Sequence, residues 1–192
     1  LLAHNDSPLA PLMMEREIYH LLDKVYAQQM LKALSPRLFN HPYYRSYSNA
    51  VRALDLRVGS EVPDITIPLT DGKIAHLSDY RGKYVLLDFW ASSCVPCMHE
   101  LPHLLAAYEK YHSKGLEIYA LSLDNDKNAW RNTIKEKDMS WVNVLRESTE
   151  VSEQYGVRGV PSNFLIDCST GKIIAVHLRG EALIAKLMEL FE

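Results

Sequence analysis

The sequence predicts an α/β domain in which a mixed β-sheet is covered on both faces by helices. A continuous apolar run at residues 84–87 indicates a buried strand, and a helical pattern follows it after a cysteine pair, Cys94 and Cys97. Strand-like and helix-like segments then alternate along the chain, as they do where helices connect the strands of a sheet. A hairpin-like segment and an amphipathic segment close the chain, which indicates that part of the sheet is antiparallel.

The individual elements follow from apolar periodicity and turn residues. Strands are expected at residues 84–90, 116–123 and 141–145, and helices at residues 98–110, 124–138, 149–155 and 181–191. Hairpins are expected at residues 65–77, around Thr70-Asp71-Gly72, and at residues 163–178, around Ser169-Thr170-Gly171.

Residues 1–58 are predicted to form a helical extension ahead of the α/β domain at residues 59–192. Residues 4–11 look like a turn, and one helix is expected from Met14 to about Leu34, where Pro36 stops it. A loop at residues 39–47 and a second helix at residues 48–56 are expected to follow. Because so short a piece offers no core of its own, we expect a remnant of a larger upstream domain rather than a simple helical arm.

Composition excludes several classes of function. The 192 residues are 47% hydrophobic and carry a formal net charge of −3, so nucleic acid is not an expected partner. No apolar run reaches the roughly 18 residues that span a bilayer. The chain starts at Leu1 rather than Met, so membrane association is expected only through a removed N-terminal segment. Three cysteines cannot form a disulfide framework, and they indicate redox chemistry instead.

The cysteine pair is expected at the junction between a strand and the N-terminus of the following helix. The first turn of a helix presents unpaired N–H groups and a partial positive charge, which stabilise a thiolate. Cys94 is therefore the predicted nucleophile, and Cys97, about one helical turn later, is placed to resolve a mixed disulfide.

Three other uses of the cysteine pair compete with redox exchange. A zinc knuckle needs a second ligand pair, which the spacing does not offer, and a c-type haem site needs His where Met98 stands. A purely structural disulfide would not explain the placement at a strand–helix junction. His99 is expected to be an ordinary exposed histidine rather than a ligand, and Cys168, in a turn, a bystander thiol.

Two separated motifs resemble those of a known family. Asp88-Phe89-Trp90-Ala91 followed by Cys94-Val95-Pro96-Cys97 is similar to the active-site signature of the thioredoxin superfamily, and residues 155–161 resemble its cis-proline segment. Cys97-Met98-His99-Glu100-Leu101-Pro102 resembles the TlpA- and ResA-like subgroup of thiol–disulfide oxidoreductases. The resemblance covers about residues 59–192, and it implies a thioredoxin fold with an N-terminal β-hairpin and a βα insertion within residues 124–145.

The resemblance implies roles for further residues. Pro161 would be the cis-proline, and Val160 before it would offer backbone hydrogen bonds to an extended substrate. Trp90, Val95 and Pro96 would lie beside the cysteines and contact that substrate.

Two acidic residues are expected to assist the cysteines. Asp88 is a carboxyl group in an apolar strand, and by resemblance it relays the proton of Cys97; an acid satisfied locally is the alternative. Glu100 would tune the thiol pKa values, and a surface glutamate in the first turns of the helix is the alternative.

We therefore expect a thiol–disulfide oxidoreductase that reduces disulfides in partner proteins and is itself re-reduced by an upstream thiol partner. No cofactor or metal is expected beyond the Cys94–Cys97 dithiol. A peroxiredoxin-type peroxidase is the enzymatic alternative. The sequence before Cys94 lacks the proline that usually precedes the peroxidatic cysteine of peroxiredoxins, which counts against this alternative. A Cu(I)-binding or adaptor module on the same fold is the non-enzymatic one. By resemblance, the expected location is the bacterial periplasm or cell envelope.

Overall fold

A computed structural model describes residues 2–18, 23–63, 65–68, 74–79, 83–146 and 150–192. The chain divides into two compact units. The helical unit comprises residues Leu1–Leu56 and Glu150–Gly156, and the sheet unit comprises residues Arg57–Thr149 and Val157–Glu192.

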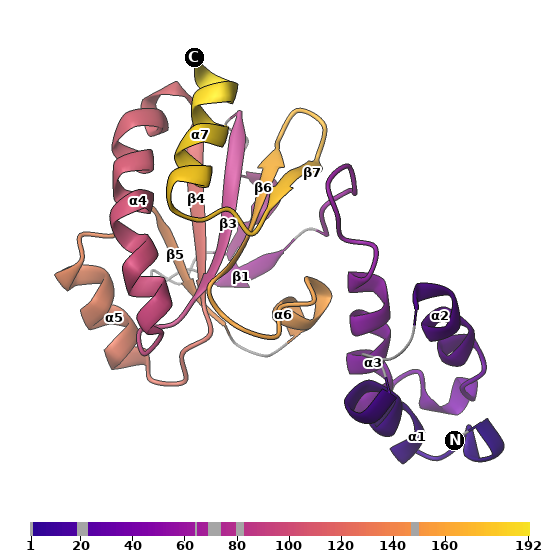
Figure 1. Cartoon of the computed structure of the whole chain (residues 1–192). Coiled ribbons are helices and arrows are strands. Elements are labelled where there is room, and N and C mark those ends of the chain that lie inside the picture. Colours follow the sequence, from indigo (N-terminus) through magenta and orange to yellow (C-terminus); the bar gives the residue numbers. More distant parts are fainter. Residues whose placement is uncertain (1, 19–22, 64, 69–73, 80–82, 147–149) are drawn as a thin grey trace. The chain divides into compact units, whose positions relative to one another are not determined.

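The sheet unit is built on a five-stranded sheet with the strand order β5-β4-β3-β6-β7 (Figure 1). Its strands are β3 (Tyr84–Trp90), β4 (Leu116–Ser122), β5 (Val142–Leu145), β6 (Ser162–Asp167) and β7 (Lys172–Val176). Strands β3, β4 and β5 run parallel, whereas β6 is antiparallel to β3 and β7 is antiparallel to β6. The predicted mixed sheet is confirmed.

The central strand β3 is buried from Val85 to Trp90, because it has a neighbouring strand on each edge and helices packed against it. Leu86 and Trp90 belong to one apolar cluster with Leu101 of α4 (Val95–Tyr111) and Leu183 of α7 (Gly180–Phe191). Helices α4 and α7 therefore cover the same face of the sheet (Figure 1). Since side chains alternate along a strand, Asp88 points toward that face as well.

The remaining elements of the sheet unit lie close to their predicted places. Helix α5 (Lys127–Glu136) starts after Asp126, whose carboxylate accepts the N–H groups of Asn128 and Ala129 at 2.8 and 3.2 Å. Together, α5 and β5 occupy the residues where the resemblance implied a βα insertion. Strands β1 (Thr66–Pro68) and β2 (Ile74–His76) pair antiparallel as the expected hairpin. Its predicted turn lies outside the described residues.

The helical unit contains α1 (Leu9–Met13), α2 (Lys24–Lys32), α3 (Pro42–Ala53) and α6 (Glu150–Gln154). Short 3-10 turns lie at Leu2–His4 and Pro36–Leu38, and a π-helical turn lies at Met14–Ile18. Contrary to the expectation from sequence, the unit has a core of its own, made of Ala10, Met14, Ala27, Leu34, Leu38, Tyr47 and Val51. The Tyr47 hydroxyl donates to the carbonyl of Ala27 at 3.2 Å inside this core.

Three predictions for the N-terminal residues were wrong. The turn expected at residues 4–11 already contains the start of α1, and the single helix from Met14 to Leu34 is interrupted. Asp23 has an extended backbone and caps a new helix, accepting the N–H of Tyr26 at 3.0 Å. Within the loop expected at residues 39–47, residues 42–47 instead form the first half of α3, in which Pro42 occupies the first turn, where proline is well tolerated.

Helix α6 packs against α3 within the helical unit. Gly156, which follows α6, has a φ of 63°. A Cβ atom placed there would lie 2.7 Å from the Cβ of Ala53, too close for any side chain. Glycine at this position therefore allows both the turn after α6 and its close packing on α3.

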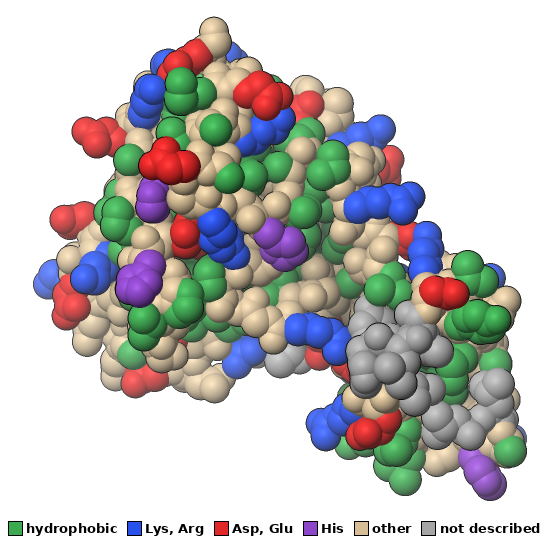
Figure 2. Space-filling model, viewed as in Figure 1, with side chains coloured by type: hydrophobic (Ala, Val, Ile, Leu, Met, Phe, Trp, Pro, Cys, Tyr) green, Lys and Arg blue, Asp and Glu red, His purple; other side chains and the backbone are tan. Residues whose placement is uncertain are grey.

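The structure also bears on the expectations about membranes and surface charge. Among the described residues, no helix is long and apolar enough to cross a membrane. Figure 2 shows acidic and basic side chains interspersed over the visible face of the sheet unit.

Candidate active site

The two cysteines of the predicted site form a disulfide between the end of β3 and the first turn of α4. The Sγ atoms of Cys94 and Cys97 are 2.06 Å apart. Cys97 is 5% exposed and belongs to the core cluster under α4, whereas Cys94 is only partly buried. One sulfur is therefore accessible to a partner, and the other lies beneath it.

The N-terminus of α4 points at the outer sulfur. Cys94 is the N-cap residue, and its Sγ accepts the backbone N–H of Cys97 at 3.1 Å. Pro96 lies in the first turn, which tolerates its missing N–H. An amide donor and the positive end of a 17-residue helix thus face the atom that would carry the negative charge of a thiolate.

Asp124 fixes the loop that carries Cys94, a function that the sequence analysis did not predict. Its carboxylate accepts both the N–H and the hydroxyl of Ser92, at 2.9 and 2.8 Å. The hydroxyl of Ser122, the last residue of β4, donates to the same group at 2.7 Å. Asp124 follows the strand beside β3, so an acidic residue at the carboxyl end of a neighbouring parallel strand was the available signal.

Asp88 is a buried acid on the face of the sheet that α4 covers. The residue is 5% exposed, and its burial raises the pKa of the carboxyl group to about 7. The positive charge of Arg179 and a hydrogen bond with Asn163 lower this pKa, whereas the negative charge of Glu100 raises it. Asp88 can therefore exchange a proton near neutral pH, as the predicted relay requires.

Glu100 bridges two helices. It lies on α4, and its Oε2 accepts the N–H of Gly180 at 2.8 Å. Gly180 is the first residue of α7, and Arg179 before it makes no side-chain cap, so Glu100 caps α7 from another helix. Glu100 is also one of the charges that act on the pKa of Asp88. This contact joins residues 80 positions apart, which the local pattern could not indicate.

The segment around Pro161 leads into β6, the antiparallel neighbour of β3. The Val160–Pro161 peptide bond is cis. Val160 packs against the same core cluster as Cys94, which places the loop on the side of the sheet where the disulfide lies. The carbonyl of Pro161 accepts a hydrogen bond from the Nη2 of Arg179, a residue that the sequence analysis also missed.

The other predicted substrate contacts differ in exposure. Val95 is 63% exposed and Pro96 is exposed, so both are available at the surface beside Cys94. Trp90 is only 2% exposed and packs under α4. His99 is exposed, as expected. Among the described residues, no group of three His, Cys, Asp or Glu side chains could hold a metal ion.

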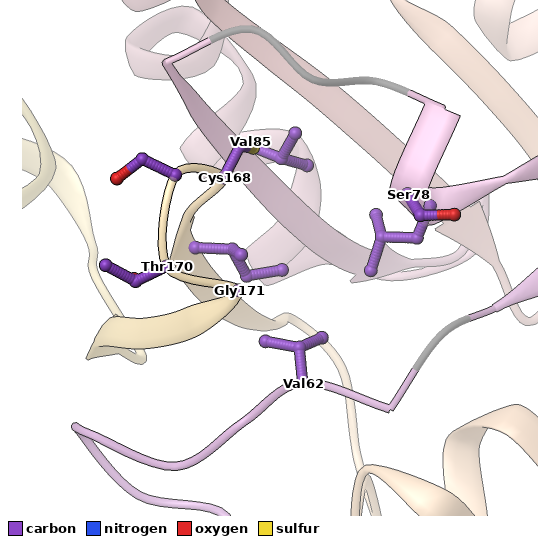
Figure 3. A pocket seen from close by; sticks show the side chains of 9 residues that line it. Val62, Ser78, Val85, Cys168, Thr170 and Gly171 are labelled. Carbon is purple, nitrogen blue, oxygen red and sulfur yellow. The ribbon is translucent and has the colours of Figure 1, made fainter.

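Cys168 lies at the opposite end of β3 from the disulfide. Its N–H donates to the carbonyl of Lys83, just before β3, at 3.1 Å. The residue lines a pocket of about 320 Å³ together with Val62, Ser78, Val85, Thr170 and Gly171 (Figure 3). The structure therefore does not bring the third cysteine to the predicted site.

Known proteins share these features. Residues 58–176 match the AhpC/TSA family. The chain is 36% identical over 126 residues to the thiol-disulfide oxidoreductase ResA of Bacillus thuringiensis subsp. konkukian, an alignment covering 66% of this chain and 72% of that protein. ResA of Halalkalibacterium halodurans is 31% identical over 153 residues, which cover 78% of this chain and 86% of the relative.

Solved structures give the same result. The thioredoxin domain of a thiol-disulfide oxidoreductase from Bacteroides vulgatus matches with a TM-score of 0.67 and 36% identity, over 72% of this chain and all of that one. A thiol:disulfide interchange protein from Bacteroides sp. matches with a TM-score of 0.65 and 37% identity, over 71% of this chain and 91% of that one.

Fold and site together define a thioredoxin-fold protein whose cysteine pair closes a disulfide at a helix N-terminus. The chain belongs to the AhpC/TSA family, and its relatives there include the ResA thiol-disulfide oxidoreductases. The predicted family, fold class and enzyme class, an oxidoreductase acting on thiols and disulfides, are confirmed.

Proposed function

We propose that the protein reduces disulfides in partner proteins by dithiol–disulfide exchange at Cys94 and Cys97. The observation that carries this proposal is the hydrogen bond from the Cys97 N–H to the Cys94 Sγ. In the reduced protein this donor and the helix N-terminus would stabilise a Cys94 thiolate over its thiol, which supplies a nucleophile near neutral pH.

The exchange would take place in two displacements. The Cys94 thiolate attacks one sulfur of the substrate disulfide, and the other substrate sulfur leaves as a thiolate. Cys97 then loses its proton and attacks the Cys94 Sγ, which breaks the mixed disulfide and expels the second substrate sulfur. Two electrons pass to the substrate, and the protein is left with the Cys94–Cys97 disulfide that the structure contains.

Asp88 would accept the proton of Cys97 in the second displacement, through water. Its burial on the face that α4 covers and its pKa of about 7 support this role, because such a group takes and returns a proton at neutral pH. Glu100 would tune the step indirectly, since its negative charge raises the pKa of Asp88.

The substrate would dock as an extended strand beside the disulfide. Val95 and Pro96 are exposed there, and the backbone of Val160, before the cis-Pro161, would pair with the incoming chain. Trp90 would support this surface from below, because it is buried.

The proposed exchange needs a disulfide-containing protein as substrate and an upstream thiol reductant to restore the dithiol. It draws on no redox group besides the two cysteines. We further propose that the protein works in the periplasm or cell envelope and contributes to redox homeostasis there; its resemblance to ResA-like proteins supports this location.

A redox titration against glutathione tests the proposed direction. Potentials of such dithiols range from about −270 to about −120 mV. If the protein is a reductant, its dithiol potential should lie toward the lower end of this range, where thioredoxin lies. A value above about −150 mV would instead indicate an oxidase. Turnover of a disulfide-bonded peptide by the wild type, compared with Cys97→Ser, shows whether the pair is used at all, and Cys168→Ser is the matched control.

The same preparations distinguish the two alternatives. Consumption of hydrogen peroxide by the reduced protein, without peptide reduction, would favour a peroxidase. Tight Cu(I) binding that survives His99→Ala but not Cys94→Ser, without reductase turnover, would favour a metal-binding module.

A further inference from the structure

The guanidinium of Arg179 links the segment before α7 to the loop of the cis-proline. Its Nη2 donates to the carbonyl of Pro161, and its Nη1 donates to the carbonyl of Leu178 at 2.8 Å. The side chain is partly buried. Two donors of one rigid fork thus hold two backbone carbonyls in a fixed relation.

The segment that carries Arg179 is itself fixed to β6. The buried Asn163 side chain donates to the Leu178 carbonyl at 2.9 Å and accepts the Leu178 N–H at 2.8 Å. His177 before it has a φ of 53°, and its N–H donates to the Asn163 carbonyl at 2.9 Å. The backbone just before Arg179 is therefore held in place, because Asn163 bonds both the N–H and the carbonyl of Leu178.

Asn163 also places this segment beside the buried acid. It is the cross-strand partner of Asp88, and the two side chains share a hydrogen bond. The charged groups that act on Asp88 are Arg179, ahead of α7, and Glu100 of α4, while its partner on β4 is the uncharged Ala120. In the reduced protein the thiol of Cys97, in the α4 cluster over the same face, adds one more titratable group.

We propose that Arg179 is a positioning residue of the site: its fork fixes the Pro161 carbonyl beside the substrate-docking backbone, and its charge acts on the carboxyl group of Asp88. One side chain would then couple the place where substrate binds to the group that moves the proton. This inference rests on the proposed function for its meaning, but its electrostatic half can be tested without turnover.

The two contributions can be separated by substitution. Arg179→Gln removes both the charge and the planar fork. Arg179→Lys keeps the charge but loses the fork, because an ammonium on a flexible stem cannot hold two carbonyls in one geometry. Arg131→Gln, on the exposed surface of α5, removes a similar charge away from the site and is the matched control.

The first measurement is the titration of the Asp88 carboxyl carbon by NMR in the oxidised protein. Loss of a nearby positive charge should raise the titration midpoint by roughly one pH unit in Arg179→Gln. Arg179→Lys and Arg131→Gln should stay close to the wild type. An unchanged midpoint in folded Arg179→Gln would overturn the electrostatic half of the proposal, whether or not the protein is a reductase.

The second measurement is the KM and kcat for a disulfide-bonded peptide. Both Arg179 variants should raise KM severalfold, because each loses the fork on Pro161, and Arg179→Lys should keep the pH profile of the wild type. Full recovery of the wild-type KM in Arg179→Lys would overturn the positioning half. Absence of reductase turnover in the wild type would count against the proposed function instead, and the NMR titration would still decide the role of the charge.

Discussion

Cysteines lie near both ends of strand β3, in contrasting surroundings. Beyond its carboxyl end, Cys94 and Cys97 meet the N-terminus of α4, and a buried acid lies on the strand face under that helix. Before its amino end, Cys168 lies in the β6–β7 turn next to a pocket. The strand of seven residues keeps the two ends about 20 Å apart.

This difference explains why we propose Cys94, and not Cys168, as the reactive cysteine. A thiolate needs a donor and a positive field at its sulfur, and a second thiol within reach. The carboxyl end of β3 provides all of these, because a strand–helix junction aims the helix N–H groups back at the chain that enters it. Since the proposed reactivity of Cys94 depends on its position in the fold, substitutions at the two ends should have very different effects.

The largest effect is expected from the cysteines themselves. Cys94→Ser should abolish peptide reduction, and Cys97→Ser should abolish turnover while a mixed disulfide with the substrate accumulates on Cys94. Non-reducing gel electrophoresis and mass spectrometry would detect that adduct. An adduct on Cys168, or sustained turnover by either variant, would reverse the contrast between the two ends.

Removal of the buried acid should have the next largest effect. Asp88→Asn cannot accept the Cys97 proton, so kcat should fall about a hundredfold at neutral pH, within the usual range for a general base. In the wild type the rate should rise with pH through about 7, as the carboxyl group loses its proton and becomes an acceptor. A pH profile of Asp88→Asn that keeps this inflection would assign it to another group.

The same acid should make stability depend on pH. Asp88 has a pKa of about 7 in the folded protein against 3.8 in the unfolded chain, so the folded state retains a proton that the unfolded state releases. Stability that is fully present below pH 4 is therefore lost as the pH rises toward 7, by roughly 3 kcal/mol between pH 5 and pH 8. Urea unfolding of the oxidised wild type and of Asp88→Asn should show this loss in the wild type alone.

Glu100 should contribute less. Glu100→Ala removes the acceptor for the Gly180 N–H at the start of α7 and should cost about 1 kcal/mol of unfolding free energy. Glu100→Gln keeps an acceptor but removes the charge, so the pH profile of turnover should shift to lower pH because the pKa of Asp88 falls. A shift to higher pH would contradict the electrostatic arrangement.

The smallest effect is expected at the other end of β3. Cys168→Ser should leave kcat, KM and the dithiol potential unchanged, because the residue lies outside the site. The enzymatic assay with the purified variant checks this directly. A change in potential would show that the third thiol exchanges with the pair.

Much of the sheet unit could be predicted from sequence because its signals are local. Residues 84–87 form a continuous apolar run at the start of β3, and the cysteine pair lies a few residues after the end of that strand. The helical unit was harder, since Tyr43, Tyr44 and Pro42 resemble a loop by composition, although proline belongs naturally in a first helical turn. There local caps mark the helix starts: Asp23 caps α2, and Pro42 occupies the first turn of α3.

The site was predictable only in part, because some of its contacts join residues that are far apart in the sequence. Cys94 and Cys97 are neighbours in sequence, and so are recognisable. Asp124 and Arg179 contact Ser92 and Pro161, 32 and 18 positions away, and these contacts exist only after the sheet has formed. A local pattern cannot indicate which of several surface charges folding will bring to the active site.

We propose that the helix N-terminus, and not the thiol alone, makes Cys94 reactive. The most direct test is the pH dependence of alkylation of the reduced protein by iodoacetamide, with each site identified by mass spectrometry. Cys94 should react with a pKa below the usual value of about 8.5, while Cys97 and Cys168 are protected or react only at higher pH. Equal reactivity of the three thiols, with a common pKa near 8.5, would show that the helix N-terminus does not activate Cys94.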